Sequence, residues 1–268
     1  MSAEAELPDP NLWLEDVQGE QALAWVHARN AHSRAQLERH PRFAAMRSSF
    51  EAILDSADKI AQVSRRGHWF YNLWRDAAHP RGLWRRCTLA SFSTATPDWD
   101  TVLDLDALAT TEGENWVWAG ATALAPAYRH CLVQLSRGGA DATVVREFDL
   151  VDKCFVLDGF RLPEAKTDVS WESADSLLVG TDTGPGSRTD SGYPRTVRRW
   201  RRGTALANAT LVFEGQPQDV SVSAWIDHTP GYTRTLLSRA TDFYNSQQFL
   251  LLPDPTSPGA ERLQKINI

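Results

Sequence analysis

The segment from His68 to Ser91 contains two short aromatic-rich runs, Trp69-Phe-Tyr-Asn-Leu-Trp74 and Leu83-Trp-Arg-Arg-Cys-Thr-Leu89. An interval that includes Asp, Pro and Gly separates them. Aromatic and β-branched residues are enriched in strands, and clusters of Gly, Pro and Asp are typical of turns. The segment therefore predicts a strand–turn–strand unit.

Three similar units follow along the chain, each with apolar runs around a polar or Gly-containing turn. They run from His130 to Leu157, from Ser176 to Trp200, and from Tyr232 to Leu252. Further strands are expected at residues 144–148 and 209–213. The openings of the four units are irregularly spaced, at intervals near the roughly 40–50 residues of a propeller blade.

These units predict a mainly β fold: an incomplete β-propeller with about four blades, the last one incomplete. A propeller blade is a four-stranded sheet, and a ring holds about 4–8 of them. A propeller that stops part-way exposes a strand edge and the face of a blade. We therefore expect the sequence to be a piece of a longer protein.

The first 57 residues have a helical pattern instead, with apolar side chains at Leu23, Val26 and Leu37. Asp16 is expected to cap the first helix, and a second helix is expected from Phe43 to Leu54, after Pro41. The predicted organisation is a helical segment over residues 1–57 and a partial propeller over residues 58–268.

Composition indicates an ordinary globular protein that does not bind nucleic acid. The 268 residues are 42% hydrophobic and 23% charged, and the net charge of −6 would repel phosphates. Cys87, Cys131 and Cys154 are expected to be buried free thiols in a reducing compartment. The segment Met1 to Pro10 has no apolar run, and no stretch is long enough to span a bilayer. A cytoplasmic location without a membrane partner is expected.

No motif for catalysis, a metal or a cofactor is found. No serine lies in a G-x-S-x-G motif, and the nearest segment, Gly184 to Gly192, is better explained as a surface loop than as a phosphate cradle. His27 and His32 are five residues apart, which is off the spacing of four that a helical metal pair needs. The prediction is therefore no catalytic, cofactor-binding or metal-binding residue.

Two charged groups have a functional and a structural interpretation. Asp104 and Asp106 could form an acid–base pair, but a solvated strand face is preferred. The arginines between Arg195 and Arg202 surround Trp200, a pattern that can bind single-stranded nucleic acid. An outward-facing strand end before a turn at Gly203 is preferred for them.

The beginning of the sequence closely resembles the opening of prolyl oligopeptidase family serine peptidases. That opening has the form D-P-[YF]-x-W-L-E-D, then E, then W-V-x-x-x-N. The matching residues are Asp9, Pro10, Trp13, Leu14, Glu15, Asp16, Glu20, Trp25, Val26 and Asn30. Asn11 replaces the usual aromatic residue. Similarity continues at residues 70–76, 146–150, 159–166 and 191–195, and covers roughly residues 8–252.

The resemblance implies a seven-bladed propeller joined to an α/β-hydrolase domain that carries a Ser-Asp-His triad. The triad would lie outside this sequence, so the chain alone is predicted to be inactive. The implied role is a substrate-gating part of a serine endopeptidase that cleaves short peptides. Cleavage after proline and cleavage after basic residues, as in the related oligopeptidase B group, both stay open.

The helical segment is expected to dock on the hydrolase domain through an apolar surface formed by Trp13, Leu14, Trp25 and Val26. The alternative function is a stand-alone propeller-like interaction module without peptidase activity. Such a module should have complete blades and a capped end, which favours the peptidase interpretation.

Overall fold

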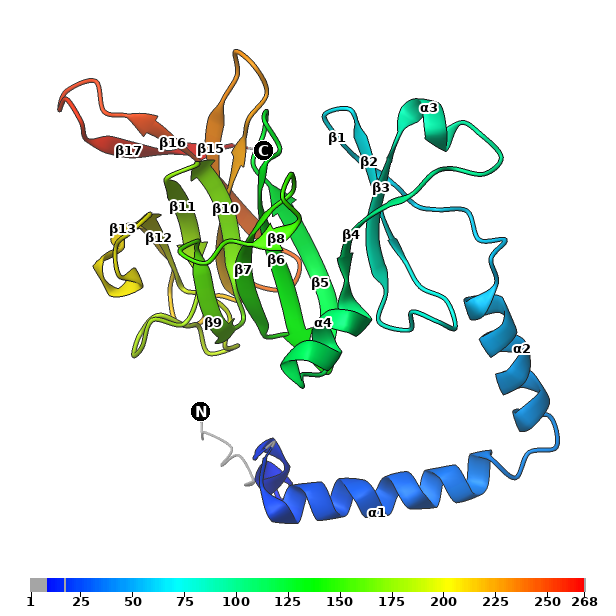
Figure 1. Ribbon diagram of the computed structural model, residues 1–268. Coiled ribbons are helices and arrows are strands. Elements are labelled where there is room, and N and C mark those ends of the chain that lie inside the picture. Colours follow the sequence, from blue (N-terminus) through cyan, green and yellow to red (C-terminus); the bar gives the residue numbers. More distant parts are fainter. Residues whose placement is uncertain (1–8, 17, 268) are drawn as a thin grey trace. The chain divides into compact units, whose positions relative to one another are not determined.

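The computed structural model describes residues 9–16 and 18–267 (Figure 1). It divides into two compact units, residues 1–59 (the helical unit) and residues 60–268 (the sheet unit). Among the described residues, no helix is long and apolar enough to cross a membrane.

The helical unit contains the 3-10 helix η1 (Leu12–Glu15), α1 (Glu20–Leu37) and α2 (Phe43–Asp55). The second predicted helix is thus confirmed, although Pro41 precedes its first turn. The predicted cap is wrong: Gly19 is the N-cap of α1, and Asp16 follows η1. A Cβ at Gly19 would lie 2.5 Å from Asp16 Oδ2, so a larger residue there would require the Asp16 side chain to move.

The sheet unit consists of four antiparallel sheets that form in chain order. The first sheet contains β1 (Ser64–Arg66), β2 (Trp69–Trp74), β3 (Leu83–Thr88) and β4 (Asp100–Asp104). The second contains β5 (Trp116–Ala123), β6 (His130–Arg137), β7 (Thr143–Asp149), β8 (Cys154–Phe155) and β9 (Arg161–Ala165). The third contains β10 (Asp168–Ser173), β11 (Ser176–Gly180), β12 (Thr196–Arg201) and β13 (Thr210–Glu214). The fourth contains β14 (Ser221–Asp227), β15 (Arg234–Ala240), β16 (Ser246–Pro253) and β17 (Glu261–Ile266).

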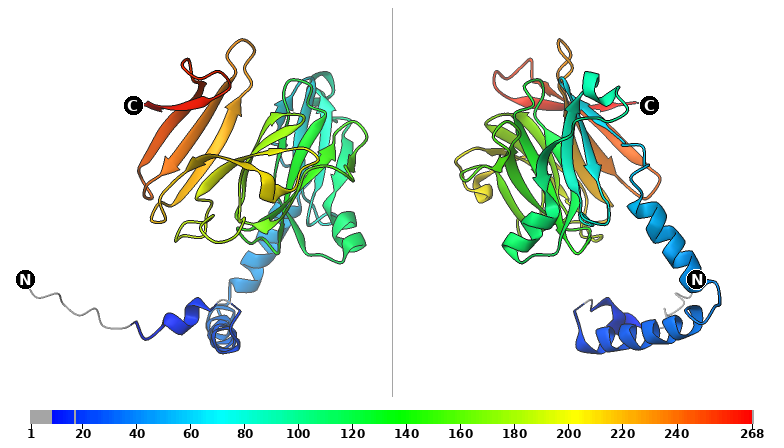
Figure 2. Two further views of the ribbon diagram at one scale, coloured as in Figure 1. Left: turned by 90° about the vertical axis from the view of Figure 1, so that its left-hand side faces the viewer. Right: turned by 45° about the vertical axis from the view of Figure 1, so that its right-hand side comes forward.

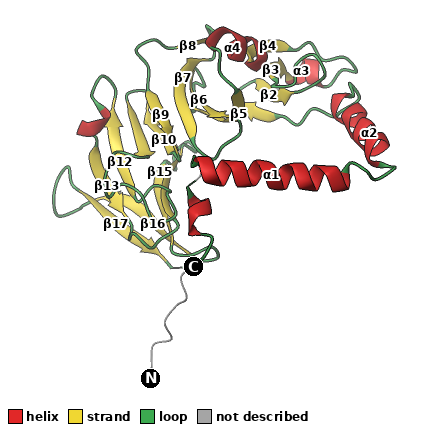
Figure 3. Cartoon of the chain, turned by 90° about the horizontal axis from the view of Figure 1, so that it is seen from below, coloured by secondary structure: helices red, strands yellow, loops and turns green. Residues whose placement is uncertain are grey.

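Short helical elements lie in the connections: α3 (Leu89–Phe92), α4 (Leu105–Glu112) and η2 (Leu206–Asn208). The sheets follow one another along an arc (Figure 3), and the fourth sheet lies at one end of the row (orange to red in Figure 2). All four predicted strand–turn–strand units are confirmed, as the pairs β2–β3, β6–β7, β11–β12 and β15–β16.

The local sequence explains these hairpins. In the second sheet, Gly138 and Gly139 follow β6 with φ of 67° and 88°. Glycine adopts this left-handed conformation without the steric cost that a Cβ would bring, so the chain can reverse between two apolar strands.

Three apolar clusters lie between successive sheets and hold the row together. Adjacent residues of β11 show how one strand serves two of them: Leu177 belongs to the second cluster and Leu178 to the third. Because successive side chains of a strand point to opposite faces, the third sheet is buried on both sides. Every residue of β11 is buried.

Two predictions about this unit are wrong. The fourth sheet is complete, because β17 pairs with β16 from Gln248 to Pro253. The sequence of β17 is largely exposed and polar, so it carries little strand signal. Cys87 and Cys131 are buried as expected, but Cys154 is exposed on β8.

Candidate functional site

The boundary between the first and second sheets, their junction, contains arginines that reach from one sheet to the other. Arg86 of β3 donates through Nη1 to the carbonyl of Leu150 (2.7 Å) and through Nε to Asp100 (3.0 Å). Arg66 of β1 donates to the carbonyl of Ala121 in β5 (2.9 Å). Fixed guanidinium groups thus supplement the apolar packing there.

The junction between the second and third sheets contains a fully buried carboxylate, Glu147 of β7. Arg202 donates to both of its oxygens (2.8 and 3.0 Å), and Phe160 N–H donates to Oε2 (2.8 Å). His130 Nδ1 lies 3.0 Å from Oε1. Burial would raise the pKa of Glu147, but hydrogen bonds from Arg202 and Phe160 outweigh it and hold the pKa below its ordinary value.

The junction between the third and fourth sheets has a third guanidinium, that of Arg199 in β12. Its Nη1 and Nη2 donate to both oxygens of Glu261 in β17 (2.9 Å each), and its Nε donates to Glu172 of β10. Hydrogen bonding to Glu261 raises the pKa of Arg199 despite partial burial. A bidentate pair fixes direction as well as distance, so Arg199 sets the position of β17 relative to the third sheet.

The same junction also contains direct links between β10 and β14. Asp168 accepts the N–H of Ala224 (2.9 Å), and Ser170 Oγ accepts the N–H of Ile226 (3.2 Å). Burial raises the pKa of Asp168 to about 6, and the Ala224 hydrogen bond offsets this only in part. Asp168 therefore binds its proton more tightly in the folded chain than an ordinary aspartate does.

One face of the fourth sheet has no sheet against it in the described part of the chain. Trp225 is 42% exposed there, and a hollow of about 850 Å³ is lined by Trp225, Leu236, Leu250 and Arg234, among others. An open face of this kind, with apolar and charged groups mixed, is typical of a surface that packs against another element.

The helical unit also exposes apolar side chains. The Trp13 and Trp25 rings contact edge to face with centroids 6.2 Å apart, and Trp25 and Val26 are about 40% exposed. Leu14 is half-buried. The structure therefore gathers Trp13 and Trp25 into one aromatic pair.

The segment from Gly184 to Gly192 is a loop between β11 and β12. Ser187 is buried, and its Oγ donates to the carbonyl of Gly184 (2.6 Å) and accepts the N–H of Thr183 (3.0 Å). Its hydroxyl therefore holds the loop together and is not presented as a nucleophile. Across the described residues, no group of three or more His, Cys, Asp or Glu side chains could hold a metal.

The preferred interpretations of the two charged groups are both corrected. Asp104 ends β4 and caps α4 by accepting the N–H of Ala107 (2.9 Å). Asp106 lies in the first turn of α4 and accepts the N–H of Arg81 and Gly82, so the two carboxylates do not share a strand face. Helix N-termini attract carboxylates, so the close spacing of Asp104 and Asp106 reflects the start of α4.

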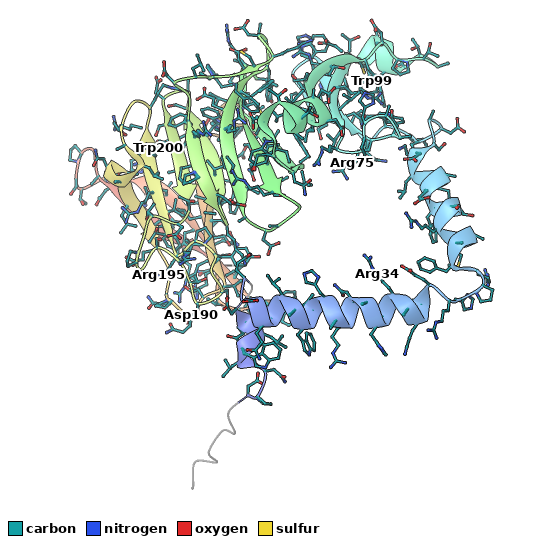
Figure 4. The ribbon with its side chains drawn as sticks, turned by 60° about the horizontal axis from the view of Figure 1, so that its bottom comes forward. Arg34, Arg75, Trp99, Asp190, Arg195 and Trp200 are labelled. Atoms are coloured by element: carbon teal, nitrogen blue, oxygen red, sulfur yellow. The ribbon has the colours of Figure 1, made fainter. Side chains whose placement is uncertain are left out.

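Of the arginines near Trp200, only Arg201 is exposed, and the others are partly buried. Arg195 pairs with Glu214 (2.7 Å), and Arg199 and Arg202 lie in the junctions described above (Arg195 and Trp200 are labelled in Figure 4). One residue in the sequence could have predicted these ion pairs. Glu147 is a charged residue between Val145 and Phe148, in a strand that is otherwise largely buried. A buried charge has to be paired, so a basic residue elsewhere was required.

Antiparallel sheets of four or five strands that stack face to face along an arc define the blades of a partial β-propeller. Residues 1–251 match the family described as "Prolyl oligopeptidase, N-terminal beta-propeller domain". The chain therefore belongs to the prolyl oligopeptidase family, as its N-terminal propeller domain.

Similar proteins agree with this assignment. An uncharacterized peptidase of Sinorhizobium fredii is 38% identical over 248 residues, which are 91% of this chain and 34% of the relative. An uncharacterized peptidase of Rickettsia prowazekii is 29% identical over 97% of this chain and 37% of the relative. The chain thus spans about a third of the length of these curated relatives.

Solved structures show the same fold. A post-proline cleaving enzyme from Rickettsia typhi matches with a TM-score of 0.85 and 29% identity, over 98% of this chain and 39% of that chain. Oligopeptidase B from Leishmania major matches with a TM-score of 0.69 and 14% identity, over 97% and 35% of the two chains. The latter likeness concerns the fold alone.

Proposed function

We propose that this chain is the substrate-gating propeller part of a serine endopeptidase that cleaves short peptides after proline. The observation that carries the proposal is the 29% identity to the Rickettsia typhi post-proline cleaving enzyme over 98% of this chain. The chain itself supplies no catalytic residue in this proposal. A Ser-Asp-His triad in an α/β-hydrolase domain of the parent protein performs the hydrolysis.

In this proposal, residues 1–57 form a helical segment that docks on the hydrolase domain, and residues 58–268 are part of the propeller. The docking surface is Trp13, Leu14, Trp25 and Val26. The exposure of Trp25 (40%) and Val26 (39%) supports it, because large apolar side chains at this exposure are stabilised when a partner covers them. Free cysteines without a disulfide among the described residues support a reducing, cytoplasmic location.

The second candidate, a stand-alone interaction module, gains one observation: the fourth sheet is complete rather than truncated. The open face around Trp225 and Leu236 counts against it, because a capped module would cover that face. The peptidase proposal accounts for both observations, since complete blades and an open face are expected within a larger propeller.

Fluorophosphonate labelling of a lysate from the source cells tests the proposal, with enrichment and peptide mapping. Peptides of this chain are expected in a labelled band much heavier than 29.9 kDa. The same purified band should hydrolyse a fluorogenic Gly-Pro peptide amide, whereas the 268-residue chain should not. Recovery of these peptides only from an unlabelled band near 29.9 kDa would overturn the peptidase proposal and favour the interaction module.

A further inference from the structure

The second sheet has a cavity of about 500 Å³ where β5 begins and β6 ends, beside β7 and β9. Its size lies within the range of sites that bind small molecules. Part of the lining is apolar and part is cationic. The apolar residues are Trp116, Val144, Leu162 and Pro163, and the cationic residues are Arg137, Arg146 and Arg161, so we call it the arginine cavity.

Two of the three arginines lie directly opposite each other. Arg146 of β7 is the cross-strand partner of Arg161 in β9, so the two side chains leave the sheet on the same face. Like charges in this position destabilise an antiparallel pair of strands. An anion that lies between the two guanidinium groups would remove this repulsion.

Only one member of this pair is neutralised by the protein. Nη1 of Arg146 donates to both oxygens of Glu112 in α4 (2.8 and 3.0 Å). The side chain of Arg161 is exposed, and its guanidinium has no hydrogen bond or ion pair within the described part of the chain. Arg161 therefore has five N–H donors available to a ligand.

Arg146 is held in place before any ligand arrives. Its side chain is only 15% exposed, and its Cζ lies 3.6 Å from the ring centroid of Phe155 in β8. Its Nε and Nη2 make no hydrogen bond to a described residue. A fixed guanidinium with free donors loses little further freedom when it binds a ligand.

The rest of the cavity wall is also fixed. Nε1 of Trp116 donates to Glu112 (2.7 Å), the same carboxylate that holds Arg146. Arg137 lies over the ring of Trp116 at 4.9 Å and is bonded to Glu114 and to Glu164 (2.7 Å to the latter). Arg137 thus already has carboxylate partners, and the donors without a partner lie on Arg146 and Arg161.

These contacts define the chemistry of the missing partner. Arg161 is the one arginine of the three without a carboxylate, so a single negative charge completes the set. The planar fork of arginine matches a carboxylate, with which it can form two parallel hydrogen bonds. The apolar part of the lining favours a ligand with an apolar body, because such a body leaves water when it enters the cavity.

We propose that the arginine cavity binds a small organic acid, whose carboxylate bridges Arg146 and Arg161 and whose apolar body lies against the apolar part of the lining. The inference does not rest on the proposed function, because every residue that it uses belongs to this chain. A free carboxylic acid and the C-terminal carboxylate of a short peptide share this chemistry.

Isothermal titration calorimetry of the 268-residue chain with phenylacetate tests the inference. A ligand of this size is expected to bind with a Kd on the order of 1 mM. Phenylacetamide has the same ring without the charge, and inorganic phosphate has the charge without the ring. Each should bind roughly tenfold more weakly than phenylacetate. Equal binding of either compound would overturn the inference.

Three variants test the assigned residues. Arg161→Gln removes the free guanidinium and should raise the Kd for phenylacetate roughly tenfold. Arg201→Gln is the matched control, because Arg201 is an exposed arginine of β12, in another sheet, and it should leave the Kd unchanged. Glu164→Gln removes a negative charge from the lining and frees Nη1 of Arg137, so it should lower the Kd about twofold. An unchanged Kd in Arg161→Gln would place the ligand elsewhere and overturn the inference.

Footprinting with phenylglyoxal, read by mass spectrometry, locates the ligand without a substitution. At a phenylacetate concentration of about ten times the Kd, modification of Arg161 should slow roughly tenfold, because about nine in ten chains are then occupied. Modification of the exposed Arg201 should not change. Equal modification of Arg161 with and without phenylacetate would also overturn the inference.

A peptide arm distinguishes the two sources of the carboxylate. Tighter binding of acetyl-Ala-Phe than of phenylacetate, without binding of its C-terminal amide, would assign the cavity to peptide C-termini. Weaker binding of acetyl-Ala-Phe would assign it to free carboxylic acids. The full-length gene product should bind phenylacetate as the chain does, and loss of binding there would show that the parent covers the cavity and would overturn the inference. Fluorophosphonate labelling of the same protein is independent of these results, so the proposed function and this inference can fail separately.

Discussion

The two units of this chain bury their apolar residues to very different degrees. In the helical unit, only Ala22 is buried among the described helical residues, and Phe50, Ile53 and Leu54 are each more than half exposed. In the sheet unit, three clusters contain side chains with no exposure at all, such as Leu237. Because helices in proteins are stabilised mainly by packing of an apolar face, we expect the helical unit to depend on a partner more than the sheet unit does.

The largest expected effect follows directly from this difference. In the isolated chain, amides of α1 and α2 should exchange with solvent almost as fast as unfolded ones, whereas those of β6 and β11 should be protected to the level of global unfolding. In a full-length parent, docking should raise the protection of α1 and α2 by orders of magnitude. Hydrogen exchange read by mass spectrometry measures this. Equal protection of the first 55 residues in both forms would contradict the docking proposal.

Core truncation sharpens the comparison in the isolated chain. Trp171→Ala removes a side chain that is 1% exposed and contacts the second cluster, so the free energy of unfolding should fall by about 3–5 kcal/mol. Phe50→Ala is the matched aromatic change in α2, where the ring is 58% exposed. It should change the unfolding free energy by less than about 0.5 kcal/mol. Urea unfolding followed by circular dichroism is the measurement, and a large effect of Phe50→Ala would mean that α2 packs tightly without a partner.

Breaking a buried ion pair should cost less than emptying the core, because its partner keeps some contact with water. Glu147→Ala leaves Arg202 in the junction without its carboxylate, and a loss of about 2–3 kcal/mol is expected. Glu261→Ala removes a partner of Arg199 that is 39% exposed and should cost no more than about 1 kcal/mol. Equal losses of unfolding free energy for the two variants would show that burial does not determine how much these ion pairs stabilise the chain.

One substitution is expected to raise the stability of the chain by a small amount. The pKa of Asp168 is raised to about 6 in the folded chain, so the folded state binds its proton more tightly than the unfolded state does. Stability therefore falls as pH rises from the unfolded pKa, about 3.9, through the folded value of about 6, and stays lower above it. Asp168→Asn removes this loss and should stabilise the chain by about 1–2 kcal/mol at neutral pH.

Unfolding curves at several pH values test the direction of this pH dependence. The advantage of Asp168→Asn should vanish below about pH 4, where the aspartate is protonated in both states. Glu147 provides the opposite control within the same protein. Its pKa is lowered in the folded chain, so its contribution should be present near neutral pH and lost as pH falls below the unfolded value. A constant advantage of Asp168→Asn at every pH would contradict the assigned cause.

Much of the fold was predictable because its signals are local. Aromatic runs such as Trp69 to Trp74 and the paired glycines Gly138 and Gly139 indicate strands and turns within a few residues of each other. The helix at Phe43–Asp55 was predictable for the same reason. The strand Glu261–Ile266 was missed, because an exposed edge strand has little apolar pattern and forms by pairing with β16.

The candidate interfaces were less predictable. An apolar surface of Trp13, Leu14, Trp25 and Val26 was expected, and the structure shows that the rings of Trp13 and Trp25 contact each other. The run from Arg195 to Arg202 was read as a solvated strand end. Arg202 and Arg199 of this run instead lie in two different junctions, because their partners Glu147 and Glu261 come from the sheets before and after it.

The sequence by itself determined the four strand–turn–strand units and the helix from Phe43, because backbone preference and side-chain alternation act over a few residues. It also determined the membership of the prolyl oligopeptidase family, through the residues of its opening motif. Only the tertiary structure decided the ionic contacts of the sheets: Arg202 meets Glu147 55 residues away, and Arg199 meets Glu261 62 residues away. The stacking and register of whole sheets place those partners together. The same stacking leaves Arg85 clamped between Trp74 and Trp99 on a face without a neighbouring sheet in the described part of the chain.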